Sequence, residues 1–229
     1  MDLAWLPKYL PLLVDGFWRT LLLMFWAGLL GFLLAIPIAL AQTGRGGILA
    51  MLSRGFTTTI RGTPLLVQVY LIYYGLGDLF AQTPEIRQSF LWPYLRDGFW
   101  YAVAAFTISV AAYEGEILRG GFLAVPRGEL EAARACGMSR FLILRRIWLP
   151  RAIQITLPAL SGEAILLLKS TPLAATITVI DLMGAANIIR AQTFRVYEPL
   201  ILVAAIYIAI AAAIAVVFRL LENRVPSPR

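Results

Sequence analysis

The stretch EAARACGMSRFLILRRIWLP, residues 131–150, interrupts a chain that is otherwise very apolar. It lies within a longer segment, residues 119–151, whose seven arginines are Arg119, Arg127, Arg134, Arg140, Arg145, Arg146 and Arg151. On insertion scales each arginine at the centre of a bilayer costs about 2.5–3.5 kcal/mol, so seven would cost roughly 20 kcal/mol. We therefore expect residues 119–151 to lie in water.

The rest of the composition indicates a membrane protein. Of the 229 residues, 60% are hydrophobic, and the mean hydropathy is +0.77, which is more apolar than a soluble domain needs to be. The net charge of +7 comes from basic residues that fall between apolar blocks, a pattern that favours membrane topology over a nucleic-acid partner. With no histidine and only Cys136, the usual zinc sites and an internal disulfide framework are excluded.

A helix needs about 20 apolar residues to cross about 30 Å of hydrocarbon. By this measure the sequence predicts an all-α integral membrane protein with one transmembrane domain, residues 1–229, and about five spans, near 17–42, 60–80, 99–118, 152–170 and 199–219.

The distribution of arginine and lysine predicts the orientation. With five spans and an outside N-terminus, 13 of the 20 basic residues lie inside, whereas a sixth span at 171–189 would reduce this number to 12. We therefore expect residues 119–151 and the C-terminus inside. Residues 171–198 would form an interfacial or re-entrant segment on the outer side, where Asp181 and Asn187 are solvated or meet a partner protein.

The basic segment has the pattern of two short helices. A turn at 126–128 precedes a run of Glu, Leu and Ala, and Gly137 is a suitable helix stop. Ser139 is a good N-cap for a second helix that reaches Trp148, after which Pro150 marks the start of the next span.

The small residues of the first short helix need a separate explanation. A solvated loop accounts for the arginines but not for Leu130, Ala133 and Gly137 on one face, with Ala132 and Ala135 beside it. Small side chains on an exposed helix permit the close approach of another protein. The sequence thus leaves a passive loop and a docking helix as alternatives and favours docking.

These residues resemble the EAA loop of ABC importer permeases. The spacing that carries the resemblance is that of Glu131, Ala132, Ala133, Gly137, Ile147, Leu149 and Pro150. Residues 112–139, residues 61–76 (RGTPLLVQVYLIYYGL) and residues 157–174 (LPALSGEAILLLKSTPLA) are similar to the polar amino-acid subfamily, and within it to the M-type permease subunit of basic amino-acid and opine importers. Gly115 departs from the usual alanine, and Gly162 from the asparagine that often precedes the glutamate.

The resemblance implies the type I ABC importer permease fold, in a bacterial inner membrane, with a periplasmic N-terminus and a cytoplasmic C-terminus. It implies four kinds of contact: a dimer of ABC ATPase subunits, a second permease subunit that forms a heterodimer with this chain, a periplasmic substrate-binding protein and membrane lipid. The EAA loop would be the coupling helix that meets the ATPase, through Glu131, Ala132, Ala133, Gly137, Arg127 and Pro150.

The chain offers no phosphate-binding loop of its own. Such a loop ends in Gly-Lys-Ser/Thr, but Lys8 follows Pro7 and Lys169 follows Leu168. We therefore expect a transport subunit without catalytic residues, cofactor or metal, with ATP and Mg²⁺ bound by the partner ATPase.

Glu163 is the most informative residue within the predicted spans. It lies 13 residues beyond Pro150, roughly 20 Å along a helix, and a carboxylate at that depth faces a partner or a watery cavity. It would recognise a cationic group on the substrate, or it would form a structural ion pair or hydrogen bond.

Other polar residues are candidates for the same pathway. Ser170 and Thr171 follow near the same helix face, and Gln68 faces either the pathway or another helix. Arg61 is expected to anchor the inner end of the second span. Glu116 is expected to pair with Arg119 at i, i+3.

Two further function classes compete with an ATP-driven amino-acid importer. An ion-coupled secondary amino-acid transporter would favour an inverted repeat with intramembrane acids in each half, and we find no convincing repeat. A membrane enzyme would need a nucleophile or metal constellation, for which the sequence gives no support.

Overall fold

The computed structural model describes residues 5–44 and 46–223, and all regular elements within them are helical. The all-α class is confirmed. Before the basic segment the helices are α1 (Leu6–Thr43), α2 (Ile48–Gly62), α3 (Leu65–Tyr70), the π-helix η1 (Leu71–Leu76), α4 (Gly77–Gln82), α5 (Pro84–Arg87), α6 (Trp92–Leu95) and α7 (Gly98–Ala124). The later helices are α8 (Arg127–Ala135), α9 (Arg140–Ile143), the π-helix η2 (Leu144–Trp148), α10 (Leu149–Ser170), the 3₁₀-helix η3 (Thr171–Ile177), α11 (Leu182–Thr193) and α12 (Tyr197–Asn223).

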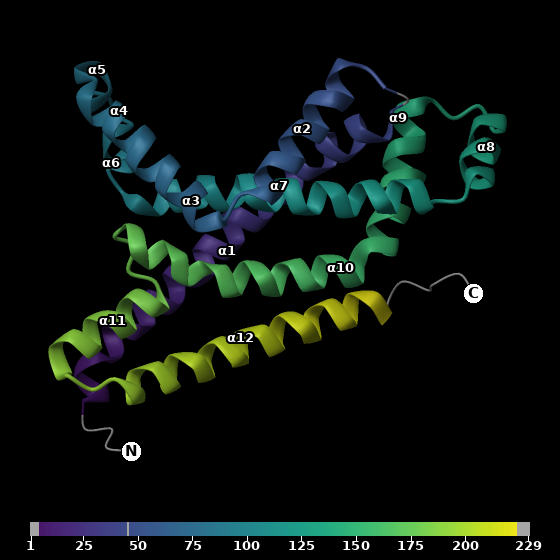
Figure 1. Cartoon of the computed structure of the whole chain (residues 1–229). Helices are drawn as coiled ribbons and strands as arrows, with labels where there is room; N and C mark the ends of the chain where they lie inside the picture. The colour runs from purple at the N-terminus through teal and green to yellow at the C-terminus, as the bar shows by residue number, and fades with distance from the viewer. Residues whose placement is uncertain (1–4, 45, 224–229) are drawn as a thin grey trace.

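Helix α7 lies at the centre of the bundle, between α1 and α10, and α12 runs along the far side of α10 (Figure 1). Small residues allow these helices to approach closely. A methyl group added at Gly31 of α1 would meet Val110 at 2.5 Å, and one added at Gly121 of α7 would meet the α10 backbone at Ala152 O at 2.7 Å. In lipid, where apolar side chains gain little by leaving the solvent, such close packing drives helix association.

The predicted spans agree with the helices in position but differ in extent. Helix α1 contains 17–42 but begins at Leu6, because Lys8 and Asp15 lower the hydropathy of its first turns without ending the helix. Residues 152–170 belong to a continuous helical segment, Arg140–Ile177, rather than to a span that restarts at Pro150. Within the described residues, three segments are long and apolar enough to cross a membrane, Leu6–Thr43, Arg140–Ile177 and Tyr197–Asn223, and the bent pair of α2 with Leu65–Gln82 makes a fourth.

Helix α7 does not meet the same hydropathy criterion. Its 27 residues extend about 40 Å, which is long enough to cross. Glu114, Glu116 and Arg119 lower its mean hydropathy, and the neighbouring helices bury most of its side chains. The fifth crossing therefore stays a prediction.

The expected span at 60–80 joins two helices that the structure separates. Helix α2 ends at Gly62, and α3 leaves it at an angle of 104°. Pro64 disfavours a helical conformation in the residue before it, and Thr63 is extended, with φ −109° and ψ 140°. The predicted span thus begins in the last turn of α2 and continues across this bend, which a hydropathy window does not register.

Residues 171–193 turn back against the bundle. The chain reverses after η3 at Thr178, whose φ is +73°, and α11 then packs against α1 and the start of α12 (Figure 1). With 12 residues, α11 extends about 18 Å, which is too short to cross about 30 Å of hydrocarbon.

The expectation that Asp181 is solvated or meets a partner protein is wrong. Its side chain is 0% exposed. The carboxylate caps α11 by accepting a hydrogen bond from Gly184 N at 2.8 Å, and it accepts another from Tyr207 Oη of α12 at 3.4 Å. Asn187, two turns into α11, is exposed as expected.

Replacement of Gly121 by alanine should loosen the packing of α7 on α10. The new methyl group would lie 2.6 Å from Thr156 Cγ2, and such overpacking typically costs about 1–3 kcal/mol. We expect a lower midpoint of thermal unfolding for the purified protein in detergent. Gly120→Ala is the matched control, because a methyl group there meets no atom within 4 Å; equal midpoints for the two variants would contradict the packing argument.

Candidate coupling helix and substrate cavity

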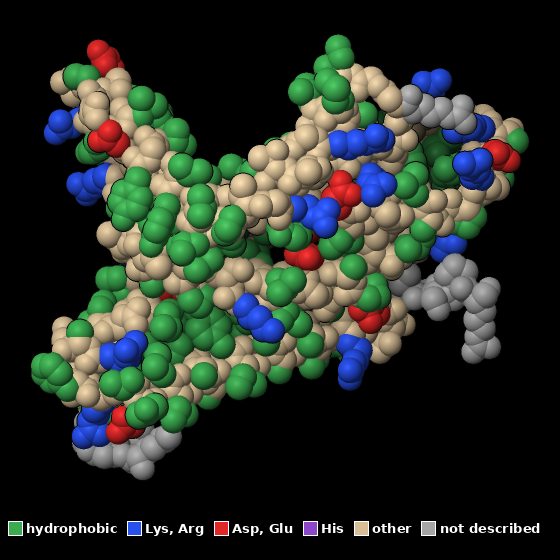
Figure 2. All heavy atoms as spheres, viewed as in Figure 1, with side chains coloured by type: hydrophobic (Ala, Val, Ile, Leu, Met, Phe, Trp, Pro, Cys, Tyr) green, Lys and Arg blue, Asp and Glu red, His purple; other side chains and the backbone are tan. Residues whose placement is uncertain are grey.

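The basic segment forms a projection at one end of the bundle. Helix α8 is set apart from the main body and is joined to it by the end of α7 and by α9 (Figure 1). Basic side chains gather over α2, α8 and α9 in Figure 2. That residues 119–151 lie in water stays a prediction.

The exposed face of α8 differs from the expected one. Ala133 is only 5% exposed, and Leu130 packs against the apolar cluster formed by the ends of α7 and α10. Exposed residues instead lie on the opposite side: Arg127, Gly128, Glu131, Ala132, Arg134 and Ala135. Leu130 and Ala133 therefore attach α8 to its own chain, and the small surface open to another protein is centred on Glu131 and Ala132.

Gly137 ends α8 as the sequence predicts. Its φ is +76°, a left-handed conformation that glycine adopts without steric cost. Gly137 N donates to Arg134 O at 2.9 Å, and Met138 N donates to Ala133 O at 3.1 Å. The predicted N-cap is also present, since Ser139 Oγ accepts a hydrogen bond from Leu142 N at 3.3 Å.

Two long-range contacts fix α8 to α10 and η2 to α7. Arg151 donates to both carboxylate oxygens of Glu129, at 2.6 and 2.9 Å. Trp148 Nε1 donates to Phe122 O at 2.9 Å, and the two rings pack edge to face. The sequence does not predict these contacts, because 22 and 26 residues separate the partners and no periodicity relates them.

The Glu129–Arg151 pair persists at neutral pH. The hydrogen bonds from Arg151 lower the pKa of the Glu129 carboxyl. A carboxyl group with a lowered folded-state pKa stabilises the fold above its ordinary pKa, and the contribution is lost as the pH falls through the lowered value. The pair therefore holds α8 in place over the physiological range.

Pro150 lies inside a continuous helix rather than at its start. Proline has no backbone N–H and cannot complete an ordinary helical turn with the residue four positions before it. The π-helix η2, just before Pro150, accommodates the missing backbone hydrogen bond, and the helix continues from α9 through η2 into α10. A rigid connection thus joins the projection to the bundle.

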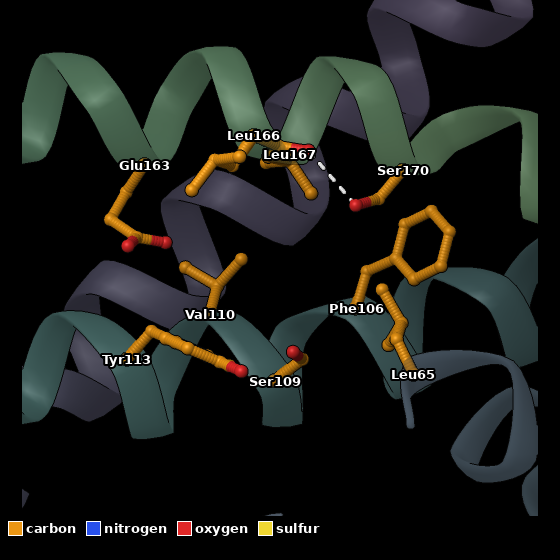
Figure 3. Close-up of a pocket in the computed structure, with 9 residues that line it drawn as sticks. All are labelled: Leu65, Phe106, Ser109, Val110, Tyr113, Glu163, Leu166, Leu167 and Ser170. Atoms are coloured by element: carbon orange, nitrogen blue, oxygen red, sulfur yellow. Dashed lines mark hydrogen bonds between the residues drawn. The ribbon is translucent and has the colours of Figure 1, made fainter. Parts of the chain in front are cut away.

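A cavity of about 210 Å³ lies between α7, α10 and the start of α3. Its walls are mostly apolar, and its lining residues are Leu65, Phe106, Ser109, Val110, Tyr113, Glu163, Leu166, Leu167 and Ser170. Figure 3 shows the Glu163 carboxylate extending from α10 toward α7, where Tyr113 and Val110 lie opposite. The Ser170 hydroxyl donates to Leu166 O at 2.9 Å. The structure thus brings Glu163 and Ser170 together on one cavity, as the sequence predicts.

Thr171 and Gln68 do not belong to this set. Thr171 is fully buried, donates to Leu168 O at 2.9 Å and lies 3.3 Å from Tyr207 Oη. Gln68 Nε2 donates to Ile60 O at 2.8 Å and to Thr63 O at 3.0 Å. Neither residue lines the cavity, so we correct both to structural roles: Thr171 joins η3 to α12, and Gln68 holds the bend between α2 and α3.

A polar chain connects α1, α2 and α7 beside the cavity. Glu116 pairs with Arg119 at 3.0 Å, which confirms the predicted i, i+3 pair, and also accepts from Thr57 Oγ1 at 3.0 Å. Thr57 in turn accepts from Gln42 Nε2 at 3.2 Å. Glu114, one turn from Val110, is only 8% exposed, and its Oε2 makes no hydrogen bond with the described residues.

The described residues contain no group of three or more cysteine or acidic side chains that could hold a metal ion. What the arrangement offers is a cavity with one carboxylate on its wall and a rigid projection at the end of the same helix. This combination is suited to binding and moving a solute.

Residues 9–226 match the family described as "Binding-protein-dependent transport system inner membrane component". The chain belongs to this family. It is therefore a membrane permease, and the family description places it in a transport system that includes a binding protein.

The permease is similar to several curated relatives over most of its length. The octopine transport system permease protein OccM of Rhizobium radiobacter is 43% identical over 221 residues, which cover 96% of this chain and 89% of the relative. The nopaline transport system permease protein NocM of Agrobacterium fabrum is 39% identical, with coverage of 97% and 91%. The histidine/lysine/arginine/ornithine transport system permease protein HisM of Escherichia coli K12 is 38% identical, with coverage of 90% and 85%.

Solved structures support the fold. A chain of an amino acid ABC transporter crystallised with histidines superposes with a TM-score of 0.81 at 36% identity, covering 98% of the permease and 99% of that chain. The inward-facing MetNI methionine ABC transporter superposes with a TM-score of 0.77 at 20% identity, covering 99% and 100%. The second likeness shows the fold alone, and the two together confirm the ABC importer permease fold.

Loss of the Glu129 charge should release α8 from α10. We expect the amide hydrogens of α8 to exchange about two- to fivefold faster in Glu129→Gln, as suits a partly exposed ion pair, measured by mass spectrometry on the detergent-purified permease. Glu131→Gln is the control, since the described ion pairs do not include that exposed carboxylate. Unchanged exchange in Glu129→Gln would show that the pair does not hold the helix.

Proposed function

We propose that this chain is the permease subunit of an ATP-driven importer that moves basic amino acids or opines across the inner membrane. The observation that carries the proposal is the Glu163 carboxylate on the wall of an otherwise mostly apolar cavity. A carboxylate within a membrane segment is expensive unless it serves a pathway or a partner. The names of the relatives, which transport octopine, nopaline and the basic amino acids, support this substrate class.

The proposed assembly contains this permease, a second and different permease subunit, two ABC ATPase subunits and a periplasmic binding protein. The N-terminus would be periplasmic, and α8 and the C-terminus cytoplasmic. The ATPase would bind α8 at Glu131 and Ala132, close to the exposed Arg127. Small side chains at this surface let a groove on the partner approach the helix backbone.

Force would reach the cavity through rigid connections. Closure of the ATPase dimer would move α8, which the Glu129–Arg151 pair joins to α10. The Trp148–Phe122 contact joins η2, at the start of the same helical segment, to α7. Glu163 lies 12 residues beyond Arg151 on α10, about 18 Å along the same helix. Movement of α10 relative to α7 would change the cavity between them and expose Glu163 to one side of the membrane at a time.

A bulky residue at Gly137 should weaken both transport and the substrate-stimulated ATP hydrolysis that drives it. Because φ at Gly137 is +76°, leucine there costs about 1–2 kcal/mol in the left-handed conformation and displaces the end of α8. We expect Gly137→Leu to lower uptake and substrate-stimulated ATPase activity about tenfold in proteoliposomes that contain the assembled transporter.

Substrate capture by the binding protein should remain normal in this variant. Gly120→Leu is the control, because Gly120 has open space around its Cβ position and no positive φ. An unaffected uptake rate in Gly137→Leu would count against docking at α8. Full-speed transport by the permease without an ATPase partner would instead favour an ion-coupled transporter.

Neutralisation of Glu163 should weaken transport of cationic substrates. Removing one partner of a buried charge pair commonly costs about 2–5 kcal/mol, so we expect uptake of radiolabelled arginine or lysine by Glu163→Gln to fall at least about tenfold. Glu198→Gln provides the control, since that carboxylate pairs with Arg195 at 3.4 Å and does not line the cavity. Unchanged arginine uptake in Glu163→Gln would rule out its role in recognition.

A further inference from the structure

Arg61 lies beside the substrate cavity, although its sequence position suggests only an anchor at the membrane surface. It belongs to the last turn of α2. Its guanidinium lies over the ring of Tyr113, 5.4 Å from the ring centre. Tyr113 is itself a wall residue of the cavity and lies on α7, opposite Glu163 of α10 (Figure 3).

The guanidinium has two acidic neighbours but forms an ion pair with neither of them in the described part of the chain. Arg61 interacts electrostatically with Glu163 and with Glu116. In the described part of the chain, however, the ion pairs are formed by other residues: Glu116 with Arg119, Glu129 with Arg151, and Arg195 with Glu198. The Arg61 side chain is also exposed, so its N–H donors remain available to a ligand.

The backbone holds Arg61 in this position. The amide group of Gln68 donates to Ile60 O at 2.8 Å and to Thr63 O and Thr63 Oγ1, each at 3.0 Å. These bonds clamp the last turn of α2 across the 104° bend that follows it. They fix the backbone that carries Arg61, while the Tyr113 ring supports its guanidinium. Both contacts lower the entropic cost of binding a ligand.

We propose that Arg61 binds the carboxylate of the transported amino acid or opine while Glu163 binds its cationic group. The inference rests on the proposed function and adds a second recognition residue to it. A guanidinium presents N–H donors in a fork that matches a carboxylate. The cavity of about 210 Å³ is smaller than the roughly 300–1,000 Å³ of pockets for drug-sized ligands, and it would hold one amino-acid-sized solute with charges at both ends.

Two simpler roles for Arg61 make different predictions. If Arg61 were only a counter-ion for Glu163, its removal would strengthen binding of every cationic solute. If Arg61 only stabilised the bend or anchored α2, its removal would lower the binding affinity for all solutes equally. If Arg61 binds a carboxylate, its removal should lower the binding affinity only for solutes that carry a carboxylate.

The experiment compares two solutes that differ only at the carboxylate. Arginine and L-argininamide share the guanidinium and the α-amino group, but the amide replaces the negative charge. Their Kd values are measured by calorimetry on the purified transporter complex in nanodiscs, without the binding protein. The wild-type complex should bind arginine about tenfold more tightly than argininamide.

Arg61→Gln should abolish this preference, because the affinity for arginine falls while the affinity for argininamide stays nearly unchanged. Arg61→Lys should retain part of the preference. Arg54→Gln is the matched control on the same helix, because the Arg54 side chain donates to Gln42 O at 3.4 Å and does not face the cavity. Should Arg61→Gln assemble poorly, the Arg61→Lys ratio still decides the question, since an unchanged wild-type preference would contradict a role for the guanidinium fork.

The outcomes separate this inference from the proposed function. Tighter binding of both solutes to Arg61→Gln, or equal weakening of both, overturns the carboxylate role of Arg61 while the Glu163 site stands. If Glu163→Gln binds both solutes as the wild type does, or if the wild type binds neither, the proposed substrate site fails and the inference fails with it.

Discussion

Close packing of α7 against α1 and α10 is the constraint on which the rest of the structure depends. Hydrocarbon provides little hydrophobic drive for association, so helices in a membrane rely on van der Waals contact at small residues and on internal hydrogen bonds. Gly31 and Gly121 supply that contact on either side of α7. Because α7 also carries Tyr113 and Glu116, the cavity wall and the polar chain beside it are positioned by the same packing.

The projection and the cavity are two ends of one mechanical element. Helix α10 is continuous with η2 and α9, and Arg151 near its start fixes α8 through Glu129. No flexible loop lies between that pair and Glu163. In the proposed mechanism, displacement of α8 at one end of α10 would become displacement of Glu163 at the other.

The sequence predicts those features whose physical cause is local. The helix stop at Gly137 and the N-cap at Ser139 follow from backbone preferences of single residues, and the helical class follows from hydropathy and composition. Partners far apart in the sequence leave no such signal, so the Glu129–Arg151 pair was not expected. Burial of polar groups is likewise hidden, because a window average treats Asp181 as a solvated residue whether or not later helices cover it.

The enclosure of Asp181 also bears on how the protein is made. One of its partners, Tyr207, belongs to the last helix, and the neighbouring Leu182 N donates to Thr20 Oγ1 of the first helix at 3.1 Å. During synthesis the segment that carries Asp181 can meet α1 early, but its carboxylate lacks the hydroxyl of Tyr207 until α12 has been made. Completion of this part of the bundle therefore waits for α12, and a product truncated before Tyr207 would leave the Asp181 carboxylate incompletely paired.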